Sequence, residues 1–318
     1  MSRMTRREFA VGAAAALAGC NREIPLPPAS VSITRAPQYD QTLYATVREI
    51  LVHHGVEARG RHVVLKPNLV EFEPASTINT HPLLVHAVFE AFRALGAASV
   101  RIAEGPGHRR ETLDMAEAAG YFHTIPGFED LFTDLNLDDV SRVTPRRQFS
   151  RLSKLYLPNT VLGADLLVSI PKMKTHHWTG ATLSMKNLFG VVPGGVYGWP
   201  KNVLHWAGIH ECIADLHALF PRQFALVDGI VGMEGNGPIQ GVPKAAGILV
   251  AGADPVAVDA TCCRVMRIDP RQIAYLRLAG GAAALAEGRI RQTGVPIATV
   301  ATRFELPPDF KGGRLELA

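Results

Sequence analysis

Lysine and histidine side chains gather in one short stretch of the sequence. Lys172, Lys174, His176 and His177 fall within six residues, and Lys186 follows ten residues after His176. No acidic residue lies between Lys172 and Lys186, so the lysines repel one another unless they share an anion or point apart. Ammonium and imidazole groups bind carboxylates and phosphates. We therefore predict a small-anion site with His176 and Lys186 as catalytic residues. The alternative is an ordinary solvated loop.

Further polar groups follow apolar segments elsewhere in the chain. The run VLKPNL at 64–69 and the run EGPGH at 104–108 each come directly after such a segment. Glycine N–H groups at a tight turn can approach an anion closely. We expect a third catalytic residue, His108, and the following substrate-binding residues: Lys66, Asn68, Gly105, Gly107, Lys172, Lys174 and Asn187.

Three carboxylates form a second candidate site. Asp228 ends an apolar segment, Glu234 lies in a glycine-rich stretch, and Asp259 lies near the start of an expected helix. Carboxylate oxygens are the ligands that Mg²⁺ and Ca²⁺ prefer. A divalent cation shared by Asp228, Glu234 and Asp259 is one expectation, and purely structural roles for the three residues are the other.

Short apolar segments alternate with helical patterns along the body of the chain. Strands are expected at 62–66, 99–104, 165–171, 224–230 and 246–252, and helices at 80–95, at 111–119 and from 255 onward. Thr80 and Asp254 are the expected N-terminal caps of two of these helices. The alternation predicts a mostly parallel, Rossmann-like α/β sheet flanked by helices, in one unit or two subdomains. Such sheets bind ligands beyond the carboxyl ends of their strands, where the polar motifs fall.

The composition excludes several classes of protein. Of 318 residues, 47% are hydrophobic, which supports a buried core and excludes general disorder. The net charge is +4 without a long basic run, which argues against a nucleic-acid-binding protein. No run of 18 apolar residues occurs, so a membrane-spanning helix is not expected. We predict a folded domain at 31–305 and a C-terminal tail at 306–318.

The N-terminus has the layout of an export signal. Arg6 and Arg7 precede the uncharged run AVGAAAALAG at 10–19, an arrangement that resembles the twin-arginine signal of bacterial export. The resemblance implies transport of the folded protein by the twin-arginine machinery to the periplasm or the outer face of the membrane. An ordinary basic N-terminus is the alternative.

The end of this run resembles the lipobox of bacterial lipoproteins. It reads Leu-Ala-Gly-Cys and ends at Cys20. The resemblance implies removal of a signal at 1–19 and attachment of a lipid to Cys20, which would anchor the protein to a membrane. The proline-rich stretch at 20–30 is then a tether. A chance run of small residues is the alternative.

The body of the chain resembles the family known as domain of unknown function 362. The similar motifs are KPNL, THP, PKxKTH, TLSMKNLFG, DGIxGMEGNGP and DPVAVDA, which together span 66–259. That family has no established reaction, so the resemblance implies a fold more than a function. Many relatives also carry ferredoxin-like cysteine runs. This chain has only Cys20, Cys212, Cys262 and Cys263, so an iron–sulfur cluster is not expected.

A fainter resemblance is to the N-terminal domain of nickel-dependent lactate racemases. The similar positions are His108, His176, Gly180, Lys186 and Pro193-Gly194. In that family the histidines exchange a proton at a hydroxyacid, and the lysine holds a pyridine-derived nickel cofactor. Ser184 and Met185 replace two glycines of the pattern, and His205 is only a loose match to the nickel ligand. The resemblance therefore implies shared architecture more than shared chemistry.

Three functional interpretations remain. The first, which we favour, is an exported enzyme that acts on a small carboxylate or phosphate by Lys/His acid–base chemistry. The second is a lipid-anchored protein that binds a small anion or cofactor without catalysis. The third is a maturation factor for the metal centre of another protein. The sequence leaves the substrate, the reaction, the cofactor and the oligomeric state open.

Overall fold

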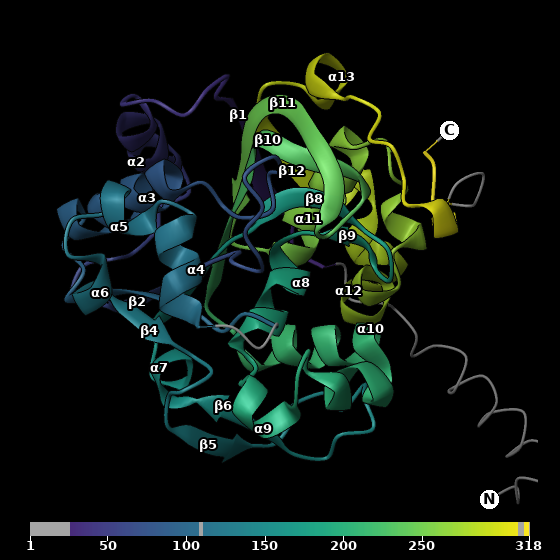
Figure 1. Ribbon diagram of the computed structural model, residues 1–318. Helices are drawn as coiled ribbons and strands as arrows, with labels where there is room; N and C mark the ends of the chain where they lie inside the picture. Colours follow the sequence, from purple (N-terminus) through teal and green to yellow (C-terminus); the bar gives the residue numbers. More distant parts are fainter. Residues whose placement is uncertain (1–25, 108–110, 311–314, 318) are drawn as a thin grey trace, which may run out of the picture.

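The computed structural model describes residues 26–107, 111–310 and 315–317, and a large sheet lies at its centre (Figure 1). Eight strands form one continuous path, and two more strands, β8 and β9, branch from it. In spatial order the path is β12 (Ile290–Gly294), β1 (Ala29–Arg35), β11 (Gln240–Gly252), β10 (Gln223–Asn236), β7 (Leu166–Ile170), β2 (His62–Pro67), β3 (Ser99–Glu104) and β4 (Phe132–Asp134), with β8 (Lys172–His176) beside β10 and β9 (Gly180–Thr182) beside β8.

Parallel pairs predominate in this sheet. Strands β10, β7, β2, β3 and β4 run parallel to one another, and so do β1 and β12. Strand β11 is antiparallel to both β1 and β10, and β9 is antiparallel to β8. The strands predicted from the sequence correspond to β2, β3, β7, the first half of β10 and the second half of β11. The prediction of a mostly parallel α/β sheet flanked by helices is therefore confirmed.

Helices cover both faces of the sheet (Figure 1). The first layer contains α2 (Leu43–His53), α3 (Pro82–Ala94), α4 (Thr112–Ala118), α5 (Tyr121–Thr124) and α6 (Phe128–Leu131). The second contains α8 (Ser184–Asn187), α10 (Asn202–Leu219), α11 (Pro255–Val265), α12 (Ala274–Leu285) and α13 (Ile297–Val300). Below the main sheet in Figure 1 lie β5 (Val140–Val143), β6 (Leu155–Pro158), α7 (Asn159–Leu162) and α9 (Gly194–Tyr197).

Successive residues of the central strands belong to two separate cores. Val63 and Leu65 of β2 pack with the first layer of helices, whereas Val64 between them packs with the second. In β10, Phe224 packs with the first layer of helices and Ala225 packs with the second. Because strand side chains point alternately to the two faces, a sheet with both faces buried needs continuous apolar runs. This requirement explains why the predicted strands could be recognised in the sequence.

The two predicted helix caps have different outcomes. Asp254 accepts a hydrogen bond from the N–H of Ala257 and caps α11, as predicted. The prediction for Thr80 is wrong, because His81 is the cap of α3. The hydroxyl of Thr80 instead donates to the carbonyl of Ile170 at the end of β7 (2.5 Å). Thr80 therefore ties the loop after β2 to the neighbouring strand.

The stretch from 172 to 187 is regular structure and not a solvated loop. It forms β8, a turn, β9 and then α8, and nearly all of its side chains are buried. Lys172, Lys174 and His176 alternate with Met173 and Thr175, which is the two-residue period of a strand. Because the alternating residues Lys172, Lys174 and His176 are ionisable, the sequence of this strand is similar to that of a solvated loop.

The ends of the domain differ slightly from the predicted bounds. β1 begins at Ala29, two residues before the expected start. Part of the expected tail packs on the domain, since Asp269 donates its N–H to the carbonyl of Leu315 and Leu315 is buried. Within the described part of the chain, no helix has the length and apolar character needed to cross a bilayer. The predicted signal at 1–19 and Cys20 lie outside the described residues.

Candidate functional site

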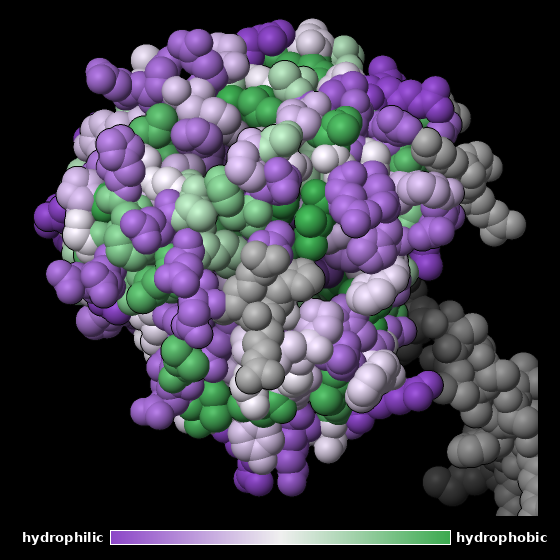
Figure 2. All heavy atoms as spheres, in the orientation of Figure 1, coloured by the Kyte–Doolittle hydropathy of each residue, from purple (hydrophilic) through white to green (hydrophobic). Residues whose placement is uncertain are grey.

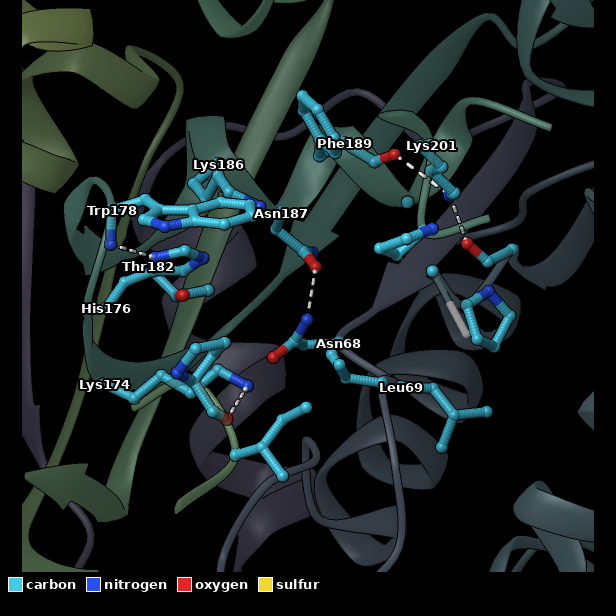
Figure 3. Close-up of a pocket in the computed structure, with 18 of the residues that line it drawn as sticks. Asn68, Leu69, Lys174, His176, Trp178, Thr182, Lys186, Asn187, Phe189 and Lys201 are labelled. Carbon is cyan, nitrogen blue, oxygen red and sulfur yellow. Dashed lines mark hydrogen bonds between the residues drawn. The ribbon is translucent and has the colours of Figure 1, made fainter. Parts of the chain in front are cut away.

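A cavity of about 220 Å³ lies at the carboxyl ends of β2, β3 and β8 (Figure 3). It brings together residues that are far apart in the sequence, as expected for ligand sites of parallel sheets. Of the residues predicted from the sequence, the following line the cavity: Asn68, Gly105, Gly107, Lys174, His176, Lys186 and Asn187. His108 lies outside the described residues, directly after Gly107.

A buried ion pair forms the floor of the cavity. Lys66 at the end of β2 pairs with Glu104 at the end of the neighbouring strand β3, and both side chains are almost fully buried. Glu104 also accepts the N–H of Gly105 (3.0 Å). A Cβ atom on Gly190 would lie 2.0 Å from Glu104 Oε1, so only glycine fits at that position. Lys66 therefore supports the cavity from below and does not line it.

Asn187 fixes the orientation of Asn68. Its Oδ1 accepts hydrogen bonds from Lys66 Nζ (3.1 Å) and Asn68 Nδ2 (3.2 Å), and its Nδ2 donates to the Lys66 carbonyl (2.9 Å) and Ser169 Oγ (3.1 Å). Because these bonds use the full capacity of the Asn187 amide, Asn68 is held with its Nδ2 toward Asn187. Asn68 Oδ1 is buried without a hydrogen-bond partner among the described residues, and so is Thr182 Oγ1. Both residues line the cavity (Figure 3).

Lys186 carries the free charge of the cavity. It is placed by α8, whose first N–H groups, from Ser184 and Met185, donate to the buried carboxylate of Asp259 (2.8 and 3.0 Å). Lys186 Nζ lies 4.4 Å from the ring centroid of Phe189 and makes no hydrogen bond or ion pair with the described residues. Burial and nearby positive charge lower the pKa of Lys186 to about 8.

Two other lysines of the cavity are held by backbone carbonyls. Lys174 Nζ donates to the carbonyls of Ile78 (2.8 Å) and Pro238 (3.2 Å), and Lys201 Nζ donates to those of Gly105 and Phe189. Burial lowers the pKa of Lys174 well below its usual value, and it lowers the pKa of Lys201 to about 7. Lys201, which lies at the start of α10, is not among the residues predicted from the sequence.

The histidines of the cavity differ in which ring nitrogen carries the proton. Nδ1 of His176 accepts the N–H of Trp178 (3.1 Å), so the neutral ring carries its proton on Nε2. Burial lowers the pKa of His176 well below its usual value, which keeps the ring neutral. Nδ1 of His205 faces the carbonyl of Lys201 (3.1 Å) and must donate to it, which leaves Nε2 as an acceptor. His177 has the same arrangement with the carbonyl of Gly237 (2.9 Å).

Lys172 lies outside the cavity, contrary to the sequence prediction. Its Nζ donates to Asp228 Oδ2 (2.6 Å) and to the hydroxyl of Tyr39 (2.9 Å), and Tyr39 donates in turn to Asp228 Oδ1 (2.8 Å). Asp228 comes from β10, which lies beside β8. The acid that neutralises Lys172 is therefore close in space but distant in sequence.

The three carboxylates of the predicted cation site are not brought together. Asp228 pairs with Lys172, Glu234 pairs with Lys244 (3.1 Å), and Asp259 accepts the N–H groups at the start of α8. Burial raises the pKa of Asp259 to about 7. Within the described ranges, no group of three or more His, Cys, Asp or Glu side chains is arranged to hold a metal ion.

Comparisons with known proteins relate this chain to one family and to two individual proteins. A family model described as "Domain of unknown function (DUF362)" matches residues 63–264, a range that contains the whole lining of the cavity. The thylakoid-associated protein sll1697 of Synechocystis sp. is 28% identical over 255 residues, which cover 77% of this chain and 76% of that protein. A crystal structure of a Thermotoga maritima protein aligns with 13% identity and a TM-score of 0.36 over 71% of this chain. The chain covers only 58% of that protein.

Proposed function

Because the chain belongs to the DUF362 family, whose description states no reaction, we propose a function from the cavity itself. The cavity binds a small substrate that bears a carboxylate or phosphate, and the protein is an enzyme that moves a proton on that substrate. The proposal rests on the residues that line the cavity and on their charges.

The observation that carries the proposal is an excess of basic over acidic side chains, with one ammonium group, that of Lys186, left without a partner among the described residues. Four lysines surround or support the cavity, namely Lys66, Lys174, Lys186 and Lys201. Glu104 is the only acidic residue that lines it among the described residues, and it is paired with Lys66. Lys174 and Lys201 have carbonyl partners, so Lys186 is the ammonium group that an incoming anion would neutralise. A small anion at Lys186 supplies the missing partner.

The histidines supply the groups for a proton transfer. His176 presents Nε2–H, which can stabilise negative charge that develops on the substrate. His205 presents an unprotonated Nε2, which can accept a proton. Burial lowers the pKa of His205, so this nitrogen is free at neutral pH. We assign the anion to Lys186, the stabilising hydrogen bond to His176 and the proton transfer to His205.

Asn68 and Thr182 restrict the chemistry of the substrate. A buried oxygen without a partner is costly, so Asn68 Oδ1 indicates a hydrogen-bond donor on the bound molecule. An ammonium group would be repelled by the surrounding lysines, which favours a neutral donor such as a hydroxyl. The proposed substrate is therefore a small anion that also carries a hydroxyl group.

We expect binding to weaken as the pH rises above about 8, because Lys186 then loses its proton. Below that pH the ammonium is present before the anion arrives. Above it, the anion must restore the proton, so affinity falls and proton uptake accompanies binding. Isothermal titration with glycolate, whose charge is constant in this range, measures both effects in buffers of different ionisation enthalpy.

Lys186→Arg is the matched control for this pH dependence. An arginine stays protonated throughout the range, so binding by this variant should vary little between neutral and alkaline pH. An affinity of the unchanged protein that stays constant across pH 8 would contradict the role of Lys186 as the anion-binding group.

We also propose that the protein is exported by the twin-arginine machinery and anchored by a lipid at Cys20. The support is the sequence at 1–20 together with the Synechocystis relative, which is named a thylakoid-associated protein. Replacing Arg6 and Arg7 with lysine should retain the precursor in the cytoplasm. Cys20→Ala should convert a protein that needs detergent for extraction into one that high salt releases. Unchanged fractionation of both variants would contradict the proposal of export and lipid anchoring.

A further inference from the structure

A strongly basic segment lies on the surface, and its cationic side chains have no acidic partner among the described residues. Between 142 and 154 the chain contains five basic residues and no acidic residue. They are Arg142, Arg146, Arg147, Arg151 and Lys154, and all five are exposed. None of the five side chains forms an ion pair or a hydrogen bond with the described residues. Their positive charge is therefore available to an external partner.

The structure holds this segment against α10 and α9. Asp215 in the second half of α10 accepts the two N–H groups at 149–150 (2.8 and 2.9 Å). The next N–H of the segment donates to the carbonyl of Ala207 in the first half of the same helix (3.4 Å). The hydroxyl of Tyr197 in α9 then accepts the N–H of Tyr156 (2.6 Å). The segment thus runs back along α10 and ends beside α9.

Exposed aromatic and aliphatic side chains lie along the same path. Trp206, directly before Ala207, is 75% exposed, and Val203 lies one turn earlier on the same helix. Tyr156 and Val196 are also exposed. In Figure 2, hydrophobic and strongly hydrophilic side chains alternate over the lower part of the molecule, where β5, β6 and α9 lie. We call these four residues and the five cations the basic–aromatic face.

We infer that the basic–aromatic face docks on a membrane surface that contains anionic lipids. Exposed Lys and Arg side chains are attracted to anionic headgroups, and Trp and Tyr rings favour the interface between headgroups and acyl chains. The apolar side chains are few and lie among cations. The centre of a stable protein–protein interface, by contrast, is depleted of charge. Both features favour a lipid surface over a protein partner.

Helix α10 contributes residues both to the basic–aromatic face and to the lining of the cavity. Trp178 lines the cavity, is 52% exposed, and its ring lies 4.8 Å from that of His205. His205 is the residue before Trp206. This inference does not depend on the chemistry proposed for the cavity.

The test is sedimentation of the full chain with phosphatidylcholine vesicles that either contain or lack phosphatidylglycerol. We expect binding only with phosphatidylglycerol, and we expect high salt to reverse it. The triple variant Arg147→Gln, Arg151→Gln, Lys154→Gln should bind more than about tenfold more weakly, since each basic residue contributes separately. Trp206→Ser should also weaken binding. The tryptophan fluorescence of the unchanged protein should shift to shorter wavelength when vesicles are added, and this shift should be smaller in Trp206→Ser.

A matched triple variant controls for the loss of charge. Arg48→Gln, Arg59→Gln, Arg222→Gln removes the same charge from exposed positions outside the basic–aromatic face. It should bind vesicles as the unchanged protein does. Equal binding by both triple variants would show that charge alone or another region, such as the N-terminal 25 residues, causes the binding, and it would overturn the inference. Equal binding to vesicles without phosphatidylglycerol would overturn it as well.

Discussion

Lys186→Met is expected to make the protein more stable and at the same time unable to bind its anion. The methionine keeps the length of the side chain but removes the ammonium group that lies in the cavity without a partner. A charge-assisted hydrogen bond contributes about 1.5–3 kcal/mol, so affinity for glycolate should fall by about tenfold or more. Titration calorimetry at neutral pH measures this loss.

The gain in stability follows from the pKa of Lys186. Burial lowers this pKa from 10.5 in the unfolded chain to about 8 in the folded protein. Between these values the unfolded chain holds the proton and the folded protein has released it, so stability rises with pH there. The destabilisation caused by the buried ammonium group of Lys186 is fully present below pH 8. Lys186→Met should therefore raise the free energy of unfolding by about 1–3 kcal/mol at pH 7, and by much less near pH 10.

Denaturant unfolding at the two pH values checks this result. Lys154→Met is the control, because Lys154 is exposed and the same substitution should leave both stability and glycolate binding unchanged. If Lys186 only supported the fold, its replacement by methionine should instead destabilise the protein. A Lys186→Met variant that is less stable than the unchanged protein and still binds glycolate would refute the proposed site.

Lys66→Met is expected to destabilise the protein by about 3–5 kcal/mol. The substitution leaves the carboxylate of Glu104 buried without its cation, and such a loss is more costly than the pair itself is stabilising. It also removes the donor that holds Asn187 Oδ1 (3.1 Å). Thermal and denaturant unfolding measure the effect, which corresponds to a fall of roughly 2–4 °C in the melting temperature per kcal/mol.

Two further variants separate the buried charge from the lost packing. The double variant Lys66→Met, Glu104→Gln removes both charges and should recover a large part of the stability. Arg93→Met breaks the exposed pair with Glu90, whose side chains are 61% and 40% exposed, and should change stability by less than about 1 kcal/mol. If Lys66→Met is as mild as Arg93→Met, the buried pair does not support the cavity floor.

The sequence by itself determined the fold class and seven of the residues that line the cavity. Continuous apolar runs such as those of β2 and β7 can be recognised locally, because a strand buried on both faces has no polar side. The polar motifs after these runs meet for a topological reason, since the carboxyl ends of neighbouring parallel strands share one edge. Asn68, Gly105 and Lys186 could therefore be assigned to one site without coordinates.

Only the tertiary structure decided which charges are free. Lys172 and Lys186 are equivalent in the sequence, yet Asp228 on the adjacent strand neutralises Lys172 while no acid of the described chain reaches Lys186. The expected cation site failed for the same reason, because Glu234 has its own partner in Lys244. Electrostatic pairing depends on distances of a few ångströms between residues far apart in the chain, and a local pattern of residue types does not contain those distances.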